Sequence, residues 1–361
     1  KHGIKLVLGY TVEGFKEKDN GVEVLLKDNP SLQADMVVLA IGVTPDTALA
    51  KEAGLELGIK GSIVVNDRME TSVPDIYAAG DAVQVKHYVT GDDALISLAG
   101  PANKQGRIIA DNICGGDSRY LGSQGSSVIK VFDMTAATTG INETNAKKSG
   151  LEVDTVILSP MSHAGYYPGG KVMTMKVVFE KETYRLLGAQ IIGYEGVDKR
   201  IDVLATAIHA GLKATQLKDL DLAYAPPYSS AKDPVNMAGF MIDNIAKGTL
   251  KQWHLEDMDK ISKDKNVVLL DVRTVGEFNR GHMKGFNNIP VDELRERISE
   301  IEKGKPVYLI CQSGLRSYIA SRILEGNGYE TYNFSGGFRF YDTVVNDRAL
   351  IEMAYACGMD Y

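Results

Sequence analysis

The stretch TSVPDIYAAGDA, from Thr71 to Ala82, decides how the first third of the chain is interpreted. Apolar residues lead into three small ones, Ala78 to Gly80, and the run then stops at a carboxylate, Asp81. Small side chains let a backbone approach a ligand closely, and glycine also permits backbone angles that other residues avoid. The stretch therefore predicts a backbone that lies against a ligand whose hydroxyl groups Asp81 can bind.

A second stretch, LAGPANKQGR from Leu98 to Arg107, has the pattern of a helix start. The first N–H groups of a helix have no partner within it and carry partial positive charge, so they suit an anionic ligand. Each stretch alone has a plainer interpretation, with Asp81 as a turn or cap residue and Pro101 as a first-turn proline. The two in this order favour a shared ligand site.

Upstream lies VLAIGVTPD, from Val38 to Asp46, and the order and spacing of the three motifs resemble those of the pyridine nucleotide-disulfide oxidoreductases. That family binds two dinucleotides, so the resemblance implies FAD and a nicotinamide reductant, with NADH against NADPH left open. It also implies that Asp81 bonds a ribityl hydroxyl of FAD. The flavin-binding residues that it implies are Gly80, Asp81, Ala82, Leu98, Ala99, Pro101 and Ala102.

Two features of that family are not found in these residues. No predicted strand is followed by G-x-G-x-x-G, the usual pyrophosphate cradle. Neither Cys114 nor Cys357 has the surroundings of a flavin-facing redox cysteine, and both are expected to be structural or incidental. We therefore expect the chain to be the C-terminal part of a longer enzyme, with that cysteine outside it.

Two tyrosine-containing stretches narrow the resemblance to the coenzyme A-disulfide reductase branch. They are SHAGYYPGG at 162–170 and LAYAPPYSSAKDPVN at 222–236. In that branch the dimerisation domain contributes tyrosines to the partner subunit's active site, which implies this role for Tyr166 and Tyr224. Binding of coenzyme A falls on Asn103, Tyr167, Tyr228 and Lys232. A turn sequence with packing aromatics is the plainer alternative for both stretches.

The last hundred residues carry a separate pattern. A buried strand, PVYLI, delivers Cys311 into CQSGLRS and a helix, a place where backbone N–H groups and the helix start stabilise a thiolate or persulfide. Gly314 permits the tight turn, Arg316 supplies positive charge, and Ser317 can donate to the sulfur or cap the helix. Four residues separate Cys311 from Arg316, and this short ring suits one sulfur atom. A structural cysteine is the plainer alternative.

Residues 256–361 as a whole resemble the rhodanese family. The resemblance rests on NVVLLDVR, EF, GHMKGFNNIP, the Cys311 loop and SGGF at 335–338, although Tyr341 stands where a tryptophan is more usual. It implies that Cys311 carries sulfane sulfur. Asp271 and Arg273, after the first strand, are expected to brace the fold as an ion pair.

These patterns predict an α/β and α+β multidomain fold. It comprises the remainder of a two-dinucleotide-binding flavoprotein, an antiparallel-sheet dimerisation domain and a rhodanese α/β domain. The expected strands are 7–15, 21–26, 34–41, two within 62–81, 128–134, 153–159, a hairpin over 171–193, and the runs NVVLLDVR and PVYLI. The expected helices are 95–113, about 197–211 and 234–247. Residues 1–45 are predicted to be the C-terminal part of the nicotinamide-binding domain, and residues 46–122 the C-terminal part of the FAD-binding domain. They are followed by a dimerisation domain at 123–247, a linker at 248–255 and a rhodanese domain at 256–361.

Composition sets further limits. A net charge of −7 over 361 residues argues against nucleic-acid and anionic-membrane partners. No apolar run reaches the roughly 18 residues of a membrane span. Three widely separated cysteines fit a reducing compartment. We expect a cytoplasmic homodimer that acts on small thiols, disulfides and persulfides, without a metal site.

Three functional hypotheses follow. The first is an FAD-dependent, NAD(P)H-driven reductase of coenzyme A disulfide, coenzyme A persulfide or polysulfide, in which Cys311 presents sulfane sulfur; the order of preference among these substrates stays open. The second is a sulfurtransferase with a dimerising, flavoprotein-like scaffold. The third is a catalytically silent interaction module. The first is preferred because the two resemblances cover nearly the whole chain and imply compatible chemistry.

Overall fold

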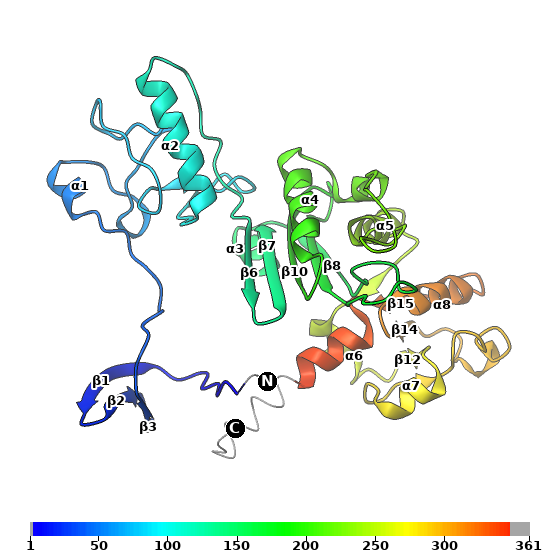
Figure 1. The fold of residues 1–361 in the computed structure, drawn as a ribbon. Helices are drawn as coiled ribbons and strands as arrows, with labels where there is room; N and C mark the ends of the chain where they lie inside the picture. The colour runs from blue at the N-terminus through cyan, green and yellow to red at the C-terminus, as the bar shows by residue number, and fades with distance from the viewer. Residues whose placement is uncertain (1–2, 347–361) are drawn as a thin grey trace. The chain divides into compact units, whose positions relative to one another are not determined.

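A computed structural model describes residues 3–346. The described chain divides into two units, one of residues 3–44 with 343–346 and one of residues 45–342. The first unit holds a three-stranded antiparallel sheet in the order β1-β2-β3 (Figure 1). Its strands are β1 (Val12–Lys18), β2 (Gly21–Leu26) and β3 (Asn29–Ala34). The predicted hairpin is confirmed by β1 and β2, although it starts five residues later than expected, and β3 was not predicted.

The prediction of a strand buried on both faces at 34–41 is wrong. Ala34 ends β3, and the exposed fractions reach 75% at Met36 and 87% at Ile41. An apolar run becomes a buried strand only when other strands pair with it on both edges. None of the strands within residues 3–346 pairs with this segment.

The second unit begins with a segment that contains little regular sheet. Its elements up to residue 113 are α1 (Ala48–Glu52), a 3-10 turn (Ile59–Gly61), β4 (Val85–Lys86), β5 (Asp93–Ala94) and α2 (Ala99–Ile113). The two strands expected within 62–81 are wrong, because the residues there form only isolated bridges such as Ile63 with Val83. The predicted helix is confirmed as α2, which starts after Leu98 because that residue is extended.

A five-stranded antiparallel sheet follows, in the order β6-β7-β10-β9-β8. Its strands are β6 (Ser127–Val131), β7 (Met134–Gly140), β8 (Val153–Leu158), β9 (Thr174–Glu180) and β10 (Leu186–Gly193). The helices are α3 (Glu143–Lys148), α4 (Val197–His209), a 3-10 helix (Ala214–Asp219) and α5 (Pro234–Ala246). Both α4 and α5 pack on the sheet, as Figure 1 shows, so the predicted sheet with two helices is confirmed. Neither β7 as a separate strand nor α3 was predicted.

The last sheet is parallel, in the order β11-β15-β14-β12-β13. Its strands are β11 (Gln252–Trp253), β12 (Val268–Asp271), β13 (Asn287–Asn288), β14 (Val307–Ile310) and β15 (Thr331–Phe334). The helices are 3-10 (Leu255–Asp257), α6 (Met258–Ile261), α7 (Val275–Arg280), 3-10 (Ile298–Glu300) and α8 (Leu315–Glu325). Trp253, inside the expected linker, belongs to this sheet and is 2% exposed.

The parallel arrangement decides where functional side chains gather. The carboxyl ends of β12, β14 and β15 lie at one edge of the sheet, so Arg273, Cys311 and Ser335 follow neighbouring strand ends. The predicted combination of an antiparallel sheet with an α/β domain is confirmed. Among residues 3–346, no helix has both the length and the apolar character needed to cross a bilayer.

Candidate active site

Cys311 lies directly after β14, in the loop that leads into α8, and only 1% of it is exposed. Its Sγ accepts hydrogen bonds from the Gly314 amide at 3.1 Å and from the Ser317 hydroxyl at 3.2 Å. Gly314 is the N-cap of α8 and has φ of 100°, a left-handed value that favours glycine. The loop therefore directs one backbone donor and one hydroxyl donor onto a single sulfur atom.

The glycine pair of SGGF, directly after β15, packs against this loop. An ideal Cβ on Gly337 would lie 2.7 Å from the Gln312 carbonyl oxygen, and Gly337 also has φ of +68°, so a larger residue does not fit. The Phe338 amide donates to the Cys311 carbonyl at 2.8 Å. The motif therefore keeps the backbone that follows β15 in contact with the Cys311 loop.

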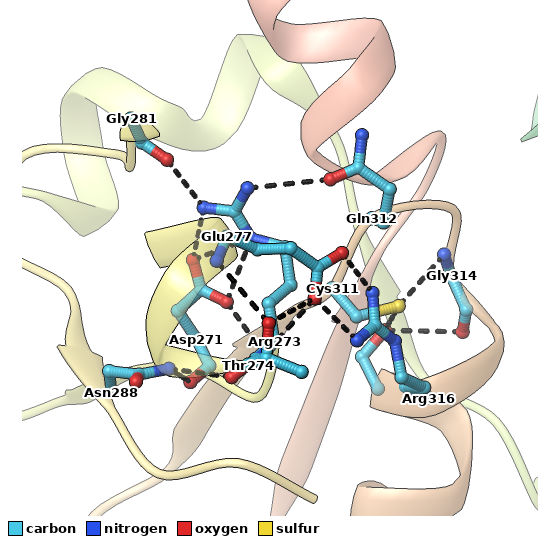
Figure 2. Close-up of polar contacts among 11 residues, drawn as sticks. Asp271, Arg273, Thr274, Glu277, Gly281, Asn288, Cys311, Gln312, Gly314 and Arg316 are labelled. Carbon is cyan, nitrogen blue, oxygen red and sulfur yellow. Dashed lines mark hydrogen bonds and ion pairs between the residues drawn. The ribbon is translucent and has the colours of Figure 1, made fainter. Parts of the chain in front are cut away.

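The predicted ion pair of Asp271 and Arg273 is confirmed. Their closest approach is 2.7 Å from Nη2 to Oδ2, and the side chains are 0% and 2% exposed. The guanidinium also donates to the Gln312 side chain at 3.4 Å and lies 3.8 Å from the centroid of the Phe338 ring. The Arg273 guanidinium thus contacts both Asp271 and the Gln312 side chain of the loop, as Figure 2 shows.

Arg316 forms a two-pronged ion pair with Glu277, and both N···O distances are 2.7 Å (Figure 2). The hydrogen bonds from Arg316 lower the pKa of Glu277 to about 2. The pKa of Arg316 is raised, first by Glu277 and to a smaller extent by the charge of Cys311. Arg316 therefore shares its positive charge with a carboxylate that the sequence did not mark as a site residue.

Glu277 was missed because its partner is 39 residues away in the chain. Its local signals were the EF pair of the rhodanese resemblance and a capping box: Glu277 accepts from the Thr274 amide at 3.0 Å, and its own amide donates to the Thr274 hydroxyl at 3.3 Å. This pattern indicates a helix start, and α7 does begin there.

Gly80 and Asp81 lie against the first turns of α2. The Gly80 amide donates at 2.8 Å to the side-chain oxygen of Gln105, a buried residue that sequence reasoning missed. An ideal Cβ on Gly80 would lie 4.0 Å from Ala102. Asp81 itself is exposed, and its carbonyl accepts from the Ser97 hydroxyl at 3.4 Å.

The start of α2 fits the anionic part of a flavin dinucleotide. Leu98 provides no side-chain cap, the first turn contains no acidic residue, and Pro101 has no N–H to satisfy. The Ala99 and Gly100 amides are therefore left to bind an outside acceptor, beside the exposed carboxylate of Asp81. Donors for an anion and an acceptor for a hydroxyl lie together, which is the donor set that FAD requires.

Cys114 is at the opposite end of α2, where it is the exposed C-cap. At 1.5 Å per residue, a helix from Ala99 to Ile113 separates it from the helix start by roughly 20 Å. Cys357 lies outside the described residues.

The structure brings together some of the predicted tyrosines. The hydroxyls of Tyr166 and Tyr224 are 2.8 Å apart, and the hydrogen bond between them raises the pKa of Tyr224. Tyr224 and Tyr228 line a cavity of about 500 Å³. Tyr167 instead packs edge-on against His163, and the Lys232 ammonium lies 5.8 Å above the Phe240 ring. Asn103 donates to the Ala99 carbonyl of its own helix at 2.9 Å.

Arg200 joins the segments that carry these tyrosines, and sequence reasoning missed it. It is 1% exposed and pairs with Asp233 at 3.0 Å. The same guanidinium donates to the carbonyls of Ser162 at 3.0 Å and Tyr228 at 3.3 Å. A helix arginine gives no sequence signal of such distant partners, so only the fold identifies this role.

Comparisons with known proteins agree with this division of the chain. The pyridine nucleotide-disulphide oxidoreductase model matches residues 1–106, and the model of that family's dimerisation domain matches 126–234. A rhodanese-like domain model matches residues 254–342. The predicted resemblances to both families are confirmed.

Three relatives illustrate the similarity. An NAD(P)H sulfur oxidoreductase (CoA-dependent) of Pyrococcus abyssi is 38% identical over 65% of this chain and 52% of its own. The crystal structure of reduced Bacillus anthracis CoADR-RHD is 47% identical with a TM-score of 0.90, covering 94% of this chain and 60% of that one. An NAD-dependent persulfide reductase from A. fulgidus is 40% identical with a TM-score of 0.84, covering 92% and 60%.

The chain spans about half the length of the curated relative and 60% of each solved chain. Within that span, both models of the flavoprotein family match in sequence order and the rhodanese-like model follows them. Residues 1–106 and 126–234 are thus similar to the pyridine nucleotide-disulphide oxidoreductases and to their dimerisation domain, and a rhodanese-like domain follows at 254–342.

Proposed function

We propose that the protein is an FAD-dependent NAD(P)H oxidoreductase that reduces coenzyme A disulfide, coenzyme A persulfide or polysulfide, with Cys311 carrying sulfane sulfur. We assign residues 1–45 and 46–122 to its nicotinamide- and FAD-binding domains, and 123–247 to a dimerisation domain. Residues 248–255 link this domain to the rhodanese domain at 256–361, and Gln252 and Trp253 within them pair as β11 with the parallel sheet. The protein acts as a cytoplasmic homodimer on small-molecule sulfur compounds.

One observation carries the proposal: a buried cysteine with two converging donors occurs in the same chain as a reductase dimerisation domain. The donors on the Cys311 sulfur, at 3.1 and 3.2 Å, favour an anionic sulfur over a neutral thiol. The Ser317 hydroxyl has one proton, which can go to this sulfur or to the Gly314 carbonyl at 3.1 Å. A thiolate or persulfide anion is the stronger acceptor, so we assign the proton to the sulfur.

The sulfur step is a displacement at sulfur. The Cys311 thiolate attacks the outer sulfur of a persulfide R–S–SH, a new S–S bond forms, and the old one breaks. The products are Cys311–S–SH and R–S⁻, so the proton stays on the transferred sulfur and no external oxidant is required. The amide of Gly314 and the hydroxyl of Ser317 stabilise the anionic sulfur.

The flavin-side residues supply binding and proton transfer. We assign Gly80, Asp81 and Ala82, with Leu98, Ala99, Pro101 and Ala102, to FAD, in line with the uncapped helix start and the exposed carboxylate. When bound, FAD supplies two-electron transfer from the nicotinamide. Tyr166 and Tyr224 hold a proton between their hydroxyls, 2.8 Å apart, and can deliver it to a leaving thiolate. Coenzyme A contacts fall on Asn103, Tyr167, Tyr228 and Lys232.

The test uses intact enzyme with its flavin. NADH should bleach the flavin absorbance, and turnover should be supported by coenzyme A disulfide, coenzyme A persulfide or polysulfide. The Cys311→Ser variant should still be bleached by NADH but should lose sulfur transfer. A colourless protein that moves sulfur to cyanide would instead establish a sulfurtransferase with a non-catalytic scaffold.

A further inference from the structure

Two arginines next to the Cys311 loop, Arg316 and Arg273, are each paired with a carboxylate. Arg316 is bound at both nitrogens by Glu277, at 2.7 Å each, and Arg273 pairs with Asp271 at 2.7 Å. Arg339 lies beside the loop as well, because its amide donates to the Gln312 carbonyl, and it is not without a partner. The residues between Cys311 and Arg316 are uncharged: Gln312, Ser313, Gly314 and Leu315. Within these two pairs the charges cancel, so neither Arg316 nor Arg273 has an unpaired charge that offsets a thiolate at Cys311.

The rim of the loop is apolar where the two helices begin. Leu315, the first residue of α8, is 66% exposed, and Val275, in the first turn of α7, is 52% exposed. These helix starts are joined by the ion pair of Glu277 and Arg316, as Figure 2 shows. A donor molecule that approaches here meets aliphatic side chains and a neutralised guanidinium.

We propose that Glu277 sets the choice of sulfur donor: it makes the Cys311 site select persulfides of organic thiols over dianionic thiosulfate. This inference rests on the proposed function of Cys311. A singly negative site repels a dianion more strongly than it repels a neutral or singly charged persulfide. Thiosulfate could recruit Arg316 only by leaving the Glu277 carboxylate without its partner. Glu277 is thus a positioning residue that acts through Arg316.

Both donors react by displacement at their outer sulfur. They differ in their leaving group and in the negative charge that they bring to the loop. With R–S–SH, the Cys311 thiolate takes the outer sulfur and releases R–S⁻. With thiosulfate, it takes the outer sulfur to give Cys311–S–S⁻ and releases sulfite, SO₃²⁻. The sulfonate of thiosulfate must remain outside the loop during attack, near the exposed Leu315 and beside an Arg316 that is already paired with Glu277.

The experiment compares two probes on the intact holoenzyme, dianionic thiosulfate and the persulfide of 2-mercaptoethanol, which carries at most one negative charge, with cyanide as acceptor. Glu277→Gln keeps an acceptor for the Thr274 amide and releases the charge of Arg316. The ratio of kcat/KM for thiosulfate to that for the persulfide should rise at least about tenfold. In the double variant Glu277→Gln with Arg316→Gln, the ratio should return toward that of the parent.

Glu330→Gln is the matched control. It also removes a carboxylate from an ion pair, with Lys251, but at the amino-terminal end of β15, the opposite edge of the sheet from the loop. Its ratio should stay at the parental value. An unchanged ratio in folded Glu277→Gln, or an equal rise in Glu330→Gln, overturns the proposal.

A measurement on the parent alone covers the case in which Glu277→Gln does not fold. Added salt screens repulsion, so the thiosulfate-to-persulfide ratio should rise with ionic strength. A flat or falling ratio contradicts the proposal. Failure of the proposed sulfur-carrier role of Cys311 would give a different result, because the Cys311→Ser variant would then still transfer sulfur from both donors.

Discussion

The Cys311 loop and the flavin-side residues differ in how far the chain completes them. The sulfur of Cys311 is buried, both of its donors lie within six residues of it, and the surrounding charges are paired. On the flavin side, Asp81 is exposed, and Tyr166 and Tyr224 are 76% and 46% exposed. In the proposed function, the first site already has its sulfur ligands in place, whereas the second offers exposed groups for a large ligand to cover.

The difference shows what each kind of site requires from a fold. A strand end, a short loop and a helix start are enough to assemble donors around one sulfur atom. A dinucleotide and coenzyme A need long surfaces with exposed donors and acceptors. We therefore expect substitutions in the Cys311 region to affect stability as well as chemistry, and those on the flavin side to affect mainly binding and turnover.

The largest expected effect on stability is at Asp271. Asp271→Asn keeps the size of the side chain but leaves the 2%-exposed guanidinium of Arg273 without its counter-charge. Breaking such a buried pair typically costs about 3–5 kcal/mol of the free energy of unfolding. Urea denaturation followed by the fluorescence of Trp253, the single tryptophan, measures it. Glu330→Gln, at a pair whose two side chains are half exposed, should cost no more than about 1 kcal/mol, and equal losses would remove the distinction.

Asp81→Ala should weaken flavin binding without destabilising the parallel sheet. Loss of one charge-assisted hydrogen bond costs roughly 1.5–3 kcal/mol of binding free energy, about a tenfold to hundredfold fall in affinity. The absorbance of the purified holoenzyme reports flavin content, and titration of apoprotein reports affinity. Wild-type content and affinity would show that Asp81 does not bind FAD.

A smaller, pH-dependent effect is expected at Glu277. Its pKa falls from 4.5 to about 2 in the folded protein because of Arg316, so the carboxylate stabilises the fold when it is ionised. That contribution is complete above about pH 4.5 and is lost as the pH falls toward 2. The stability difference between parent and Glu277→Gln should therefore shrink between pH 5 and pH 3. A difference that grows on acidification has the wrong sign for this ion pair.

The smallest effect on stability is expected for Tyr224→Phe, because this side chain is largely exposed and its hydroxyl bonds only Tyr166 within the described residues. The melting temperature should not change, while reductase turnover should fall. Mixed dimers test the site: one full-length subunit carries Tyr224→Phe and the other lacks the flavin-side cysteine. Absence of any regained activity would mean that the tyrosine does not act across the subunit interface.

The sequence predicted best where the signal is local. The apolar strand before Cys311, Gly314 at a left-handed turn and the helix after it all lie within one short segment, and the structure contains each. Pairings between distant residues were missed, including Glu277 with Arg316 and Arg200 with Asp233. No periodicity or motif records such contacts, because the fold alone brings the partners together.

The wrong predictions have a related cause. The run at 34–41 has the composition of a buried strand, but composition does not supply the neighbouring strands that bury it. The segment at 62–81 has apolar residues and turn signals, yet its backbone makes only isolated bridges. In both cases the residues allow a strand, and pairing elsewhere in the chain decides whether one forms.

The proposed function requires that a sulfur atom become bound to Cys311. After a single turnover of the holoenzyme with an organic persulfide and no acceptor, the mass of the Cys311 peptide should increase by one sulfur. The Cys311→Ser peptide should show no increase, and NADH with coenzyme A should remove the added sulfur from the parent. A Cys311 peptide of unchanged mass, in enzyme that still turns over the persulfide, would contradict the role of this cysteine as the sulfur carrier.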